Sequence, residues 1–215
     1  SFEFSPKLGI RELPELDSKH QSNVPGLYVV GDLADAPIIK VALNQGYDVA
    51  KAVCDELKTP SDDPDLLDVI IVGAGPAGIG AALAMAEKGF RYVLVEKERP
   101  FNTIQNFPKA KFVFSEPRSI ENKGSFWFED ASKEELVDRW GEALETRKLV
   151  LHQPEGVNDI QKEGGLFQVK TKVGAGGLLG EYPRHEGTHD GTAGAENVYR
   201  AKRVILAIGR RADVN

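Results

Sequence analysis

Residues 68–78 read DVIIVGAGPAG, a short apolar run that passes directly into a glycine-rich loop. Residues 69–72 have the β-branched composition of a buried strand, and the alanine-rich segment after the loop is typical of a helix that ends near Lys88. A second strand is expected at Tyr92–Val95, and Glu96 follows it. This strand-helix-strand unit predicts a parallel sheet, because parallel neighbours need a crossover connection between them.

The loop has the spacing Gly73-x-Gly75-x-x-Gly78, in which each glycine has its own task. The first permits a tight turn, the second lets backbone approach a pyrophosphate, and the third lets helix and strand pack closely. The helix N-terminus would stabilise phosphate charge, and the Glu96 carboxylate would accept hydrogen bonds from ribose hydroxyls. The motif therefore predicts a dinucleotide site; the alternative is a purely structural turn.

The rest of the chain divides around an expected linker. Residues 58–67 combine two prolines with three aspartates and have no periodicity, which is typical of an exposed connection. Residues 1–57 before it contain a strand-like run, then Gly31-Asp32, then a helical pattern. Residues 68–215 after it contain the glycine motif, and we expect the two parts to form one domain.

The C-terminal half completes the predicted fold. Ser132 followed by Glu135 is a capping-box pattern, and it predicts a helix over residues 132–148. The glycine- and alanine-rich residues 174–197 are expected to form a mobile loop. The predicted class is α/β, a Rossmann-like domain with a mostly parallel sheet flanked by helices and a small antiparallel β-element at residues 149–173. The further strands are expected at residues 149–152, 157–160, 166–173 and 203–208.

Residues 68–78, with Pro76-Ala77 inside the glycine motif, resemble the start of the FAD domain in thioredoxin-reductase-like flavoproteins. These belong to the FAD-dependent pyridine nucleotide-disulfide oxidoreductase superfamily. Residues 24–46 resemble the segment that ends this FAD domain, so the two pieces stand here in reversed order. A circularly permuted domain would explain the order; alternatively, the first segment belongs to a preceding module or completes the site of a neighbouring chain in a homodimer.

The resemblance implies FAD as the cofactor and assigns roles to single residues. Asp32 would face the ribityl chain and pyrophosphate, the helix start at Ile38-Ile39 would point at the flavin, and Asn106 lies in a stretch that resembles the region along the flavin. Lys97 is expected at the adenosine end. The expected cofactor-binding residues are Gly73, Ala74, Gly75, Pro76, Ala77, Gly78, Glu96, Lys97, Asn106, Gly209, Gly31, Asp32, Ile38 and Ile39.

The function that the resemblance implies is a flavoprotein oxidoreductase that passes electrons from NAD(P)H through FAD to an unidentified acceptor. The family's Cys-x-x-Cys pair is missing, because Cys54 is the single cysteine. One full glycine motif is present, so a nicotinamide domain would have to follow Asn215. Two alternatives stay open: a non-catalytic FAD-binding or docking module of a larger electron-transfer protein, and an NAD(P)-binding domain without flavin.

Composition argues against several other classes of protein. A net charge of -6 argues against a nucleic-acid binder, since such proteins concentrate lysine and arginine. The longest apolar run is interrupted by Gly73, Gly75, Pro76 and Gly78, so no membrane span is expected. A single cysteine fits a reducing compartment, and we expect a cytoplasmic protein. No acid-base catalyst and no metal site are expected, and His185 and His189 have no helix to align them.

Overall fold

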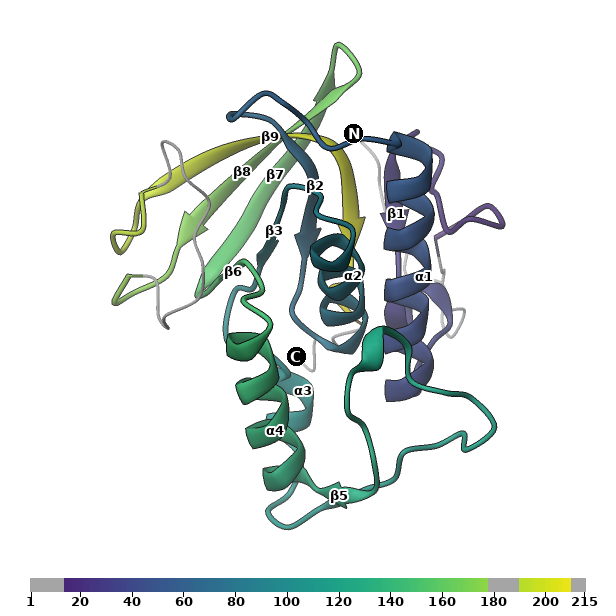
Figure 1. The fold of residues 1–215 in the computed structure, drawn as a ribbon. Helices are drawn as coiled ribbons and strands as arrows, with labels where there is room; N and C mark the ends of the chain where they lie inside the picture. The colour runs from purple at the N-terminus through teal and green to yellow at the C-terminus, as the bar shows by residue number, and fades with distance from the viewer. Residues whose placement is uncertain (1–13, 178–189, 210–215) are drawn as a thin grey trace, which may run out of the picture.

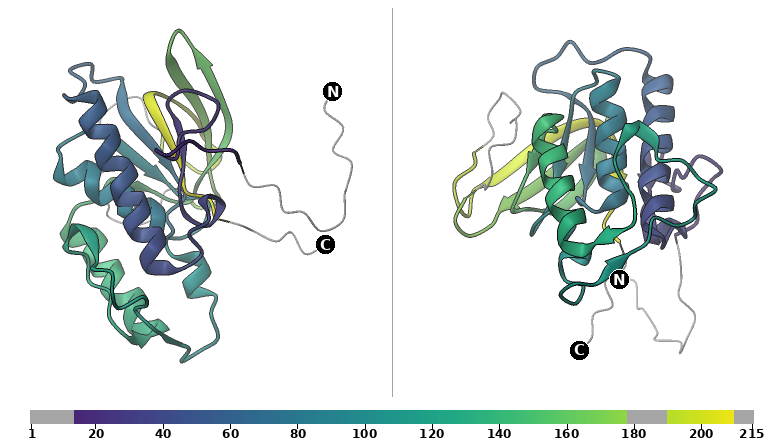
Figure 2. Two further views of the ribbon diagram at one scale, coloured as in Figure 1. Left: turned by 90° about the vertical axis from the view of Figure 1, so that its right-hand side faces the viewer. Right: turned by 60° about the horizontal axis from the view of Figure 1, so that its bottom comes forward.

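The structure is a computed structural model that describes residues 14–177 and 190–209. One seven-stranded sheet runs through the molecule, in the order β6-β3-β2-β9-β8-β7, with β1 also pairing with β9 (Figure 1). The helices lie on one side of the parallel strands, and the antiparallel end of the sheet curves over their other side (Figure 2). The strands of the sheet are β1 (Leu27–Val29), β2 (Leu67–Val72), β3 (Tyr92–Val95), β6 (Leu151–His152), β7 (Glu155–Glu163), β8 (Leu166–Val173) and β9 (Glu196–Leu206).

The parallel part of the sheet is buried on both faces, which is why residues 69–72 of β2 are an unbroken apolar run. Because successive side chains point to opposite faces, Val69 and Ile71 pack in the core beneath the helices. Ile70 and Val72 pack in a second core beneath the antiparallel strands. The predicted mostly parallel α/β architecture is confirmed, with two cores separated by the central sheet.

Two helices in close contact cover the first face. They are α1 (Ile39–Leu57) and α2 (Pro76–Glu87). A Cβ on Gly46 would lie 1.8 Å from the carbonyl oxygen of Ala77, and a Cβ on Gly80 would lie 1.9 Å from that of Leu43. The two helix backbones therefore meet directly, at a distance that only glycine permits at these two positions.

Residues before the linker are part of the same sheet. β1 pairs in parallel with the end of β9, with Val29 opposite Leu206. The linker is exposed over much of its length, yet its Ser61 amide donates to the buried Asp68 carboxylate at 3.0 Å. Lys202 Nζ donates to the same carboxylate at 2.7 Å, so this end of the linker is fastened to β9.

The antiparallel strands differ in extent from the expectation. β7 and β8 form a hairpin as predicted within residues 149–173, but Leu151–His152 instead joins β3 in the parallel sheet. β9 begins at Glu196, inside the segment expected to be a loop. Burial alternates along its first residues, so that Tyr199 and Ala201 pack inward while Val198 between them and the loop is exposed. Of the rest of that segment, residues 178–189, including His185 and His189, lie outside the described residues.

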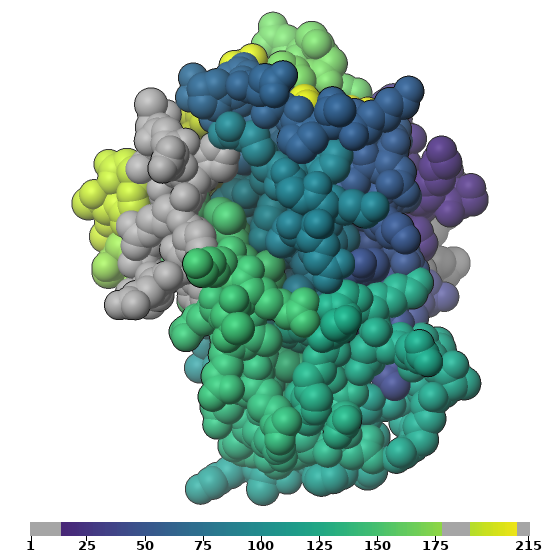
Figure 3. All heavy atoms as spheres, in the orientation of Figure 1, coloured from purple at the N-terminus to yellow at the C-terminus, as the bar shows by residue number. Residues whose placement is uncertain are grey.

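The segment between β3 and β6 forms the lower part of the molecule, beneath α2 (Figure 3). The Ser132 hydroxyl accepts a hydrogen bond from the Glu135 amide at 3.2 Å, as the capping box predicts. Trp140 is buried and packs edge-on against Phe101 and Phe128. The elements here are α3 (Asn102–Gln105), β4 (Phe112–Val113), η2 (Lys123–Ser125), β5 (Ala131–Ser132) and α4 (Lys133–Thr146), and β4 pairs with β5 as a separate antiparallel ribbon.

Candidate functional site

The parallel strands end together at one edge of the sheet. In β1, β9, β2, β3 and β6, the pairing places Val29, Leu206, Val72, Val95 and His152 side by side at the carboxyl ends. The loops that follow these residues therefore emerge at the same edge. In open parallel sheets this edge is where ligands bind.

The glycine loop after β2 has two packed glycines and one open glycine. Gly73 has φ +102°, and a Cβ there would lie 2.6 Å from the Ala207 carbonyl oxygen. A Cβ on Gly78 would lie 1.8 Å from the carbonyl oxygen of Gly73. A Cβ on Gly75 would meet no atom of the described chain within 4 Å. The backbone at Gly75 thus faces open space, which fits the approach of a pyrophosphate.

The N-terminus of α2 adds a favourable field at the same place. Gly75 is its N-cap, no side chain caps the helix, and Pro76 stands at its first position. Proline pre-sets the helical φ at this position and has no amide hydrogen to leave unpaired. The remaining first-turn amides and the positive end of the helix dipole favour an anion here.

Glu96 is held against the loop rather than projecting freely from the strand end. It is buried, its Oε2 accepts from the Ala74 amide at 2.8 Å, and its Oε1 accepts from the Glu98 amide at 2.9 Å. A carboxylate has about four lone-pair sites, so two further hydrogen bonds remain available for ribose hydroxyls. Glu96 can therefore support the loop and bind a sugar at once.

The Gly31-Asp32 turn lies beside the glycine motif. It forms the short helix η1 (Gly31–Ala34) directly after β1. Gly31 has φ +82°, and a Cβ there would lie 3.1 Å from the Cβ of Ala77. The Gly31 amide donates to Gln45 Oε1 on α1 at 2.6 Å, which fixes the turn. The structure thus places the half-buried Asp32 next to the start of α2.

Four other residues were predicted to bind the cofactor, and they lie outside the strands. Ile38 is 48% exposed and is the N-cap of α1, with Ile39 partly buried behind it. Gly209 has φ +65° in the segment after β9. Asn106 is exposed, and its Oδ1 accepts from Arg99 Nη2 at 3.1 Å.

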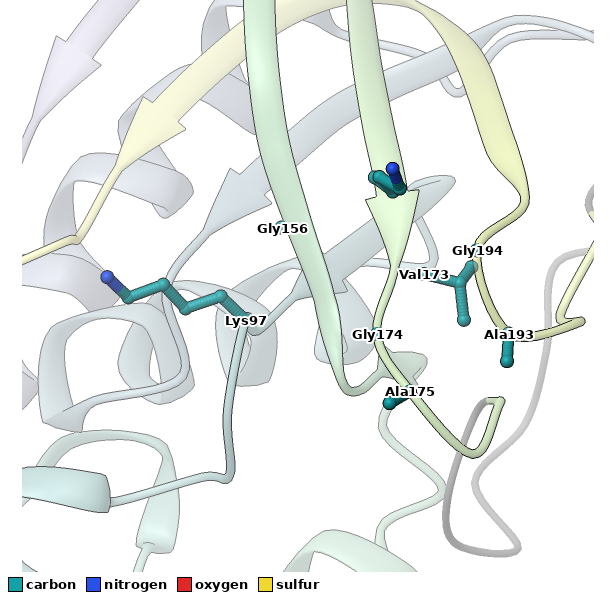
Figure 4. A pocket seen from close by; sticks show the side chains of 8 residues that line it. Lys97, Gly156, Val173, Gly174, Ala175, Ala193 and Gly194 are labelled. Atoms are coloured by element: carbon teal, nitrogen blue, oxygen red, sulfur yellow. The ribbon is translucent and has the colours of Figure 1, made fainter.

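Lys97 lies at the rim of a shallow pocket of about 550 Å³ between β7, β8 and the start of β9. Its side chain extends away from Val173 and Ala193 on the opposite wall (Figure 4). The Lys97 ammonium therefore does not converge with these two residues of the opposite wall.

Sequence reasoning missed the residues that support the site from behind. Gln45, which fixes Gly31, lies in a helical pattern whose polar positions look like a solvated face. Gly46 and Gly80, which bring α1 against α2, lie outside the glycine motif. Their helical context was the available signal, because glycine inside a helix is costly unless close packing requires it.

Known proteins with a similar sequence or fold bear on this geometry. Residues 70–176 match the model of the pyridine nucleotide-disulphide oxidoreductase family. The bacillithiol disulfide reductase from Bacillus cereus superimposes with a TM-score of 0.52 at 25% identity, over 67% of this chain and 40% of that one.

The chain belongs to the pyridine nucleotide-disulphide oxidoreductase superfamily. A ferredoxin–NADP reductase from Ignicoccus hospitalis is 30% identical over 56% of this chain and 39% of its own length. A digeranylgeranylglycerophospholipid reductase from Methanocella arvoryzae is 31% identical over 69% of this chain and 42% of its own length. The chain therefore spans about two fifths of the length of these relatives.

Superfamily membership identifies the cofactor as FAD. The open backbone at Gly75, the uncapped start of α2 and the acidic end of β3 are the features of this chain that fit it. Among the described residues, no helix has the length and apolar character needed to cross a bilayer.

Proposed function

We propose that the chain is the FAD-holding portion of a flavoprotein oxidoreductase that passes electrons from NAD(P)H through FAD to an acceptor. The carrying observation is the shared edge of the sheet. There the open Gly75 loop, Glu96 and the Gly31-Asp32 turn come together from three segments of the chain.

In this proposal each segment has one binding task. The Gly75 backbone and the α2 N-terminus hold the pyrophosphate, Glu96 accepts from the adenosine ribose, and Asp32 binds on the ribityl side. The start of α1 at Ile38 and Ile39 faces the flavin. FAD supplies the electron chemistry, and the chain binds and orients it.

We also propose that residues 1–57 and 68–215 make one FAD domain within one chain. The pairing of β1 with β9 and the direct contact of α1 with α2 support this arrangement. The linker would then join what are two ends of the domain in the unpermuted family. A cytoplasmic location and a homodimer remain proposals from the sequence.

The acceptor would take electrons from the flavin without a thiol relay on this chain. Cys54 is buried on α1, and burial raises the pKa of its thiol to about 11. A thiol with so high a pKa is a poor nucleophile at neutral pH. The relatives' names point to both a protein acceptor, ferredoxin, and a small disulfide; we propose that the acceptor is reached outside this chain's own residues.

Anaerobic reduction tests the electron flow. The purified FAD-loaded protein is mixed with NADH or NADPH, and the flavin band near 450 nm is followed. Bleaching within seconds to minutes would support the oxidoreductase. A flavin that dithionite reduces but that neither nucleotide reduces, in this chain or in any longer protein that contains it, would favour the non-catalytic module instead. Gly75→Val, which should not retain FAD, serves as the matched control.

A further inference from the structure

A buried polar cluster lies directly behind Glu96, where the antiparallel strands meet the parallel sheet. His152 and Glu155 are both fully buried, and His152 Nδ1 lies 3.4 Å from Glu155 Oε2. The Tyr199 hydroxyl lies 2.9 Å from His152 Nδ1 and donates to Glu155 Oε1 at 3.0 Å. These three residues come from the end of β6, the start of β7 and the middle of β9.

The Glu155 carboxylate is surrounded by donors from β8 and β9. The Thr171 hydroxyl donates to its Oε1, and Asn197 Nδ2 donates to the same oxygen at 3.4 Å. Burial and the neighbouring carboxylate both raise the pKa of Tyr199, so its hydroxyl keeps its proton and stays a donor. A buried carboxylate is costly unless it is hydrogen-bonded in this way.

The cluster holds the Glu96 backbone from both sides. The Glu96 amide donates to the His152 carbonyl oxygen at 2.9 Å, and the Glu155 amide donates to the Glu96 carbonyl oxygen at 2.7 Å. The Glu96 carboxylate on the other side accepts from the Ala74 amide in the glycine loop. A displacement of Glu155 would therefore move Glu96, the residue expected to bind ribose.

Apolar packing could join the two layers of strands here, as it does at Ile70 and Phe167. A polar network costs more to bury, but it fixes the position of its members more closely than apolar contacts do. We infer that Glu155, held by Thr171 and Tyr199, is a positioning residue that sets Glu96 for the adenosine ribose of FAD. This inference rests on the proposed role of Glu96.

The test is a double-mutant cycle on FAD affinity, measured by quenching of FAD fluorescence with the full chain. Glu96→Gln and Glu155→Gln are each expected to weaken binding about tenfold, the effect of one charge-assisted hydrogen bond. If Glu155 acts through Glu96, the double variant binds no more weakly than Glu96→Gln alone. Thr171→Val should weaken binding severalfold, whereas Thr171→Ser, which keeps the hydroxyl, should restore it.

Val53→Ala on α1 is the control for a general loss of stability, because Val53 is buried on the other face of the sheet. It should lower the unfolding midpoint and leave the affinity of the folded protein unchanged. If Glu155→Gln does not fold, the two Thr171 variants decide the question.

Three results would count against the inference. Additive losses in the double variant, or unchanged affinity in Glu155→Gln and Thr171→Val, would overturn it while the role of Glu96 stands. Unchanged affinity in Glu96→Gln would overturn the ribose role and the inference together.

Discussion

Glycines of one motif have different physical tasks in this chain. Gly73 and Gly78 lie against backbone carbonyl oxygens, so their lack of a side chain serves the fold. Gly75 has an ordinary φ of -79° and open space beside it, so nothing in the described protein itself requires glycine there. A ligand approaching the backbone supplies the physical reason for glycine at this position.

Gly75→Val and Gly78→Ala should therefore affect different properties. The first should weaken FAD binding, and the second should lower the stability of the fold. Gly75→Val should change the free energy of unfolding of the apoprotein by less than about 1 kcal/mol and weaken FAD binding at least about 100-fold. Gly78→Ala should destabilise the fold by about 1–3 kcal/mol or more, because a Cβ would meet the Gly73 carbonyl. Urea unfolding and FAD titration measure the two effects separately. Normal FAD affinity in Gly75→Val would contradict the placement of the pyrophosphate.

Cys54 should be nearly inert in the folded protein. With its thiol pKa raised to about 11, roughly one molecule in a thousand carries the thiolate at pH 8. Alkylation by iodoacetamide should be slow there, rise about tenfold per pH unit as the thiolate fraction grows, and level off above about pH 11. Mass spectrometry of timed samples, with urea-unfolded protein as the control, measures the rate. Native alkylation as fast as the unfolded control would contradict the burial of Cys54.

At the scale of elements, the sequence predicted those helices and strands that short-range interactions determine. The strand-helix-strand unit at residues 69–95 and the Ser132 cap of α4 are determined by composition and short-range hydrogen bonds, and the structure has both. The start of β9 was missed because its inward Asn197 is polar and its outward Val198 is apolar, and only pairing with β8 makes it a strand. The cluster at Glu155 was missed for a similar reason, since its donors on β8 and β9 lie 16 to 44 residues away in sequence.

The same limit applies to the site. The glycine motif and Glu96 could be predicted because their spacing follows from one strand-helix-strand unit. The role of Gln45 behind Gly31 depends on the packing of α1 against the turn after β1, which the spacing of the motif does not determine. The site assignment as a whole stays a prediction until binding is measured.

The close contact between α1 and α2 should depend on the glycine at position 46 of α1. Gly46→Ala is expected to destabilise the protein by about 1–3 kcal/mol or more, because the new Cβ would meet the Ala77 carbonyl at 1.8 Å. Gly141→Ala in α4, where a Cβ meets no atom of the described chain within 4 Å, should instead stabilise by up to about 1 kcal/mol. Thermal unfolding of the pair compares them directly. Equal effects of the two substitutions would contradict the close approach of the helices.

At the scale of the whole molecule, a segment before the linker completes the sheet and one wall of the site. β1 supplies the Gly31-Asp32 turn, and α1 supplies the surface on which α2 packs. Because the two pieces of the chain contact each other directly, the fold depends on this contact more than on their order along the chain. Connection through the linker mainly raises their effective concentration.

Cutting the linker should therefore leave a functional complex, whereas deleting the first segment should not. A protease site inserted at the exposed residues 62–63 should give two fragments that elute together and retain FAD. A chain that begins at residue 60 should lose FAD and expose apolar surface of α2. Size-exclusion chromatography and a dye for exposed apolar surface measure both. Wild-type FAD affinity in the shortened chain would contradict the single-domain arrangement.

The central claim is that this chain holds FAD at the carboxyl edge of its sheet. An absorption spectrum of the purified protein, followed by chromatography of the cofactor released on denaturation, tests it most directly. We predict paired bands near about 370 and 450 nm and the release of FAD. A colourless protein that also fails to bind added FAD would contradict the claim.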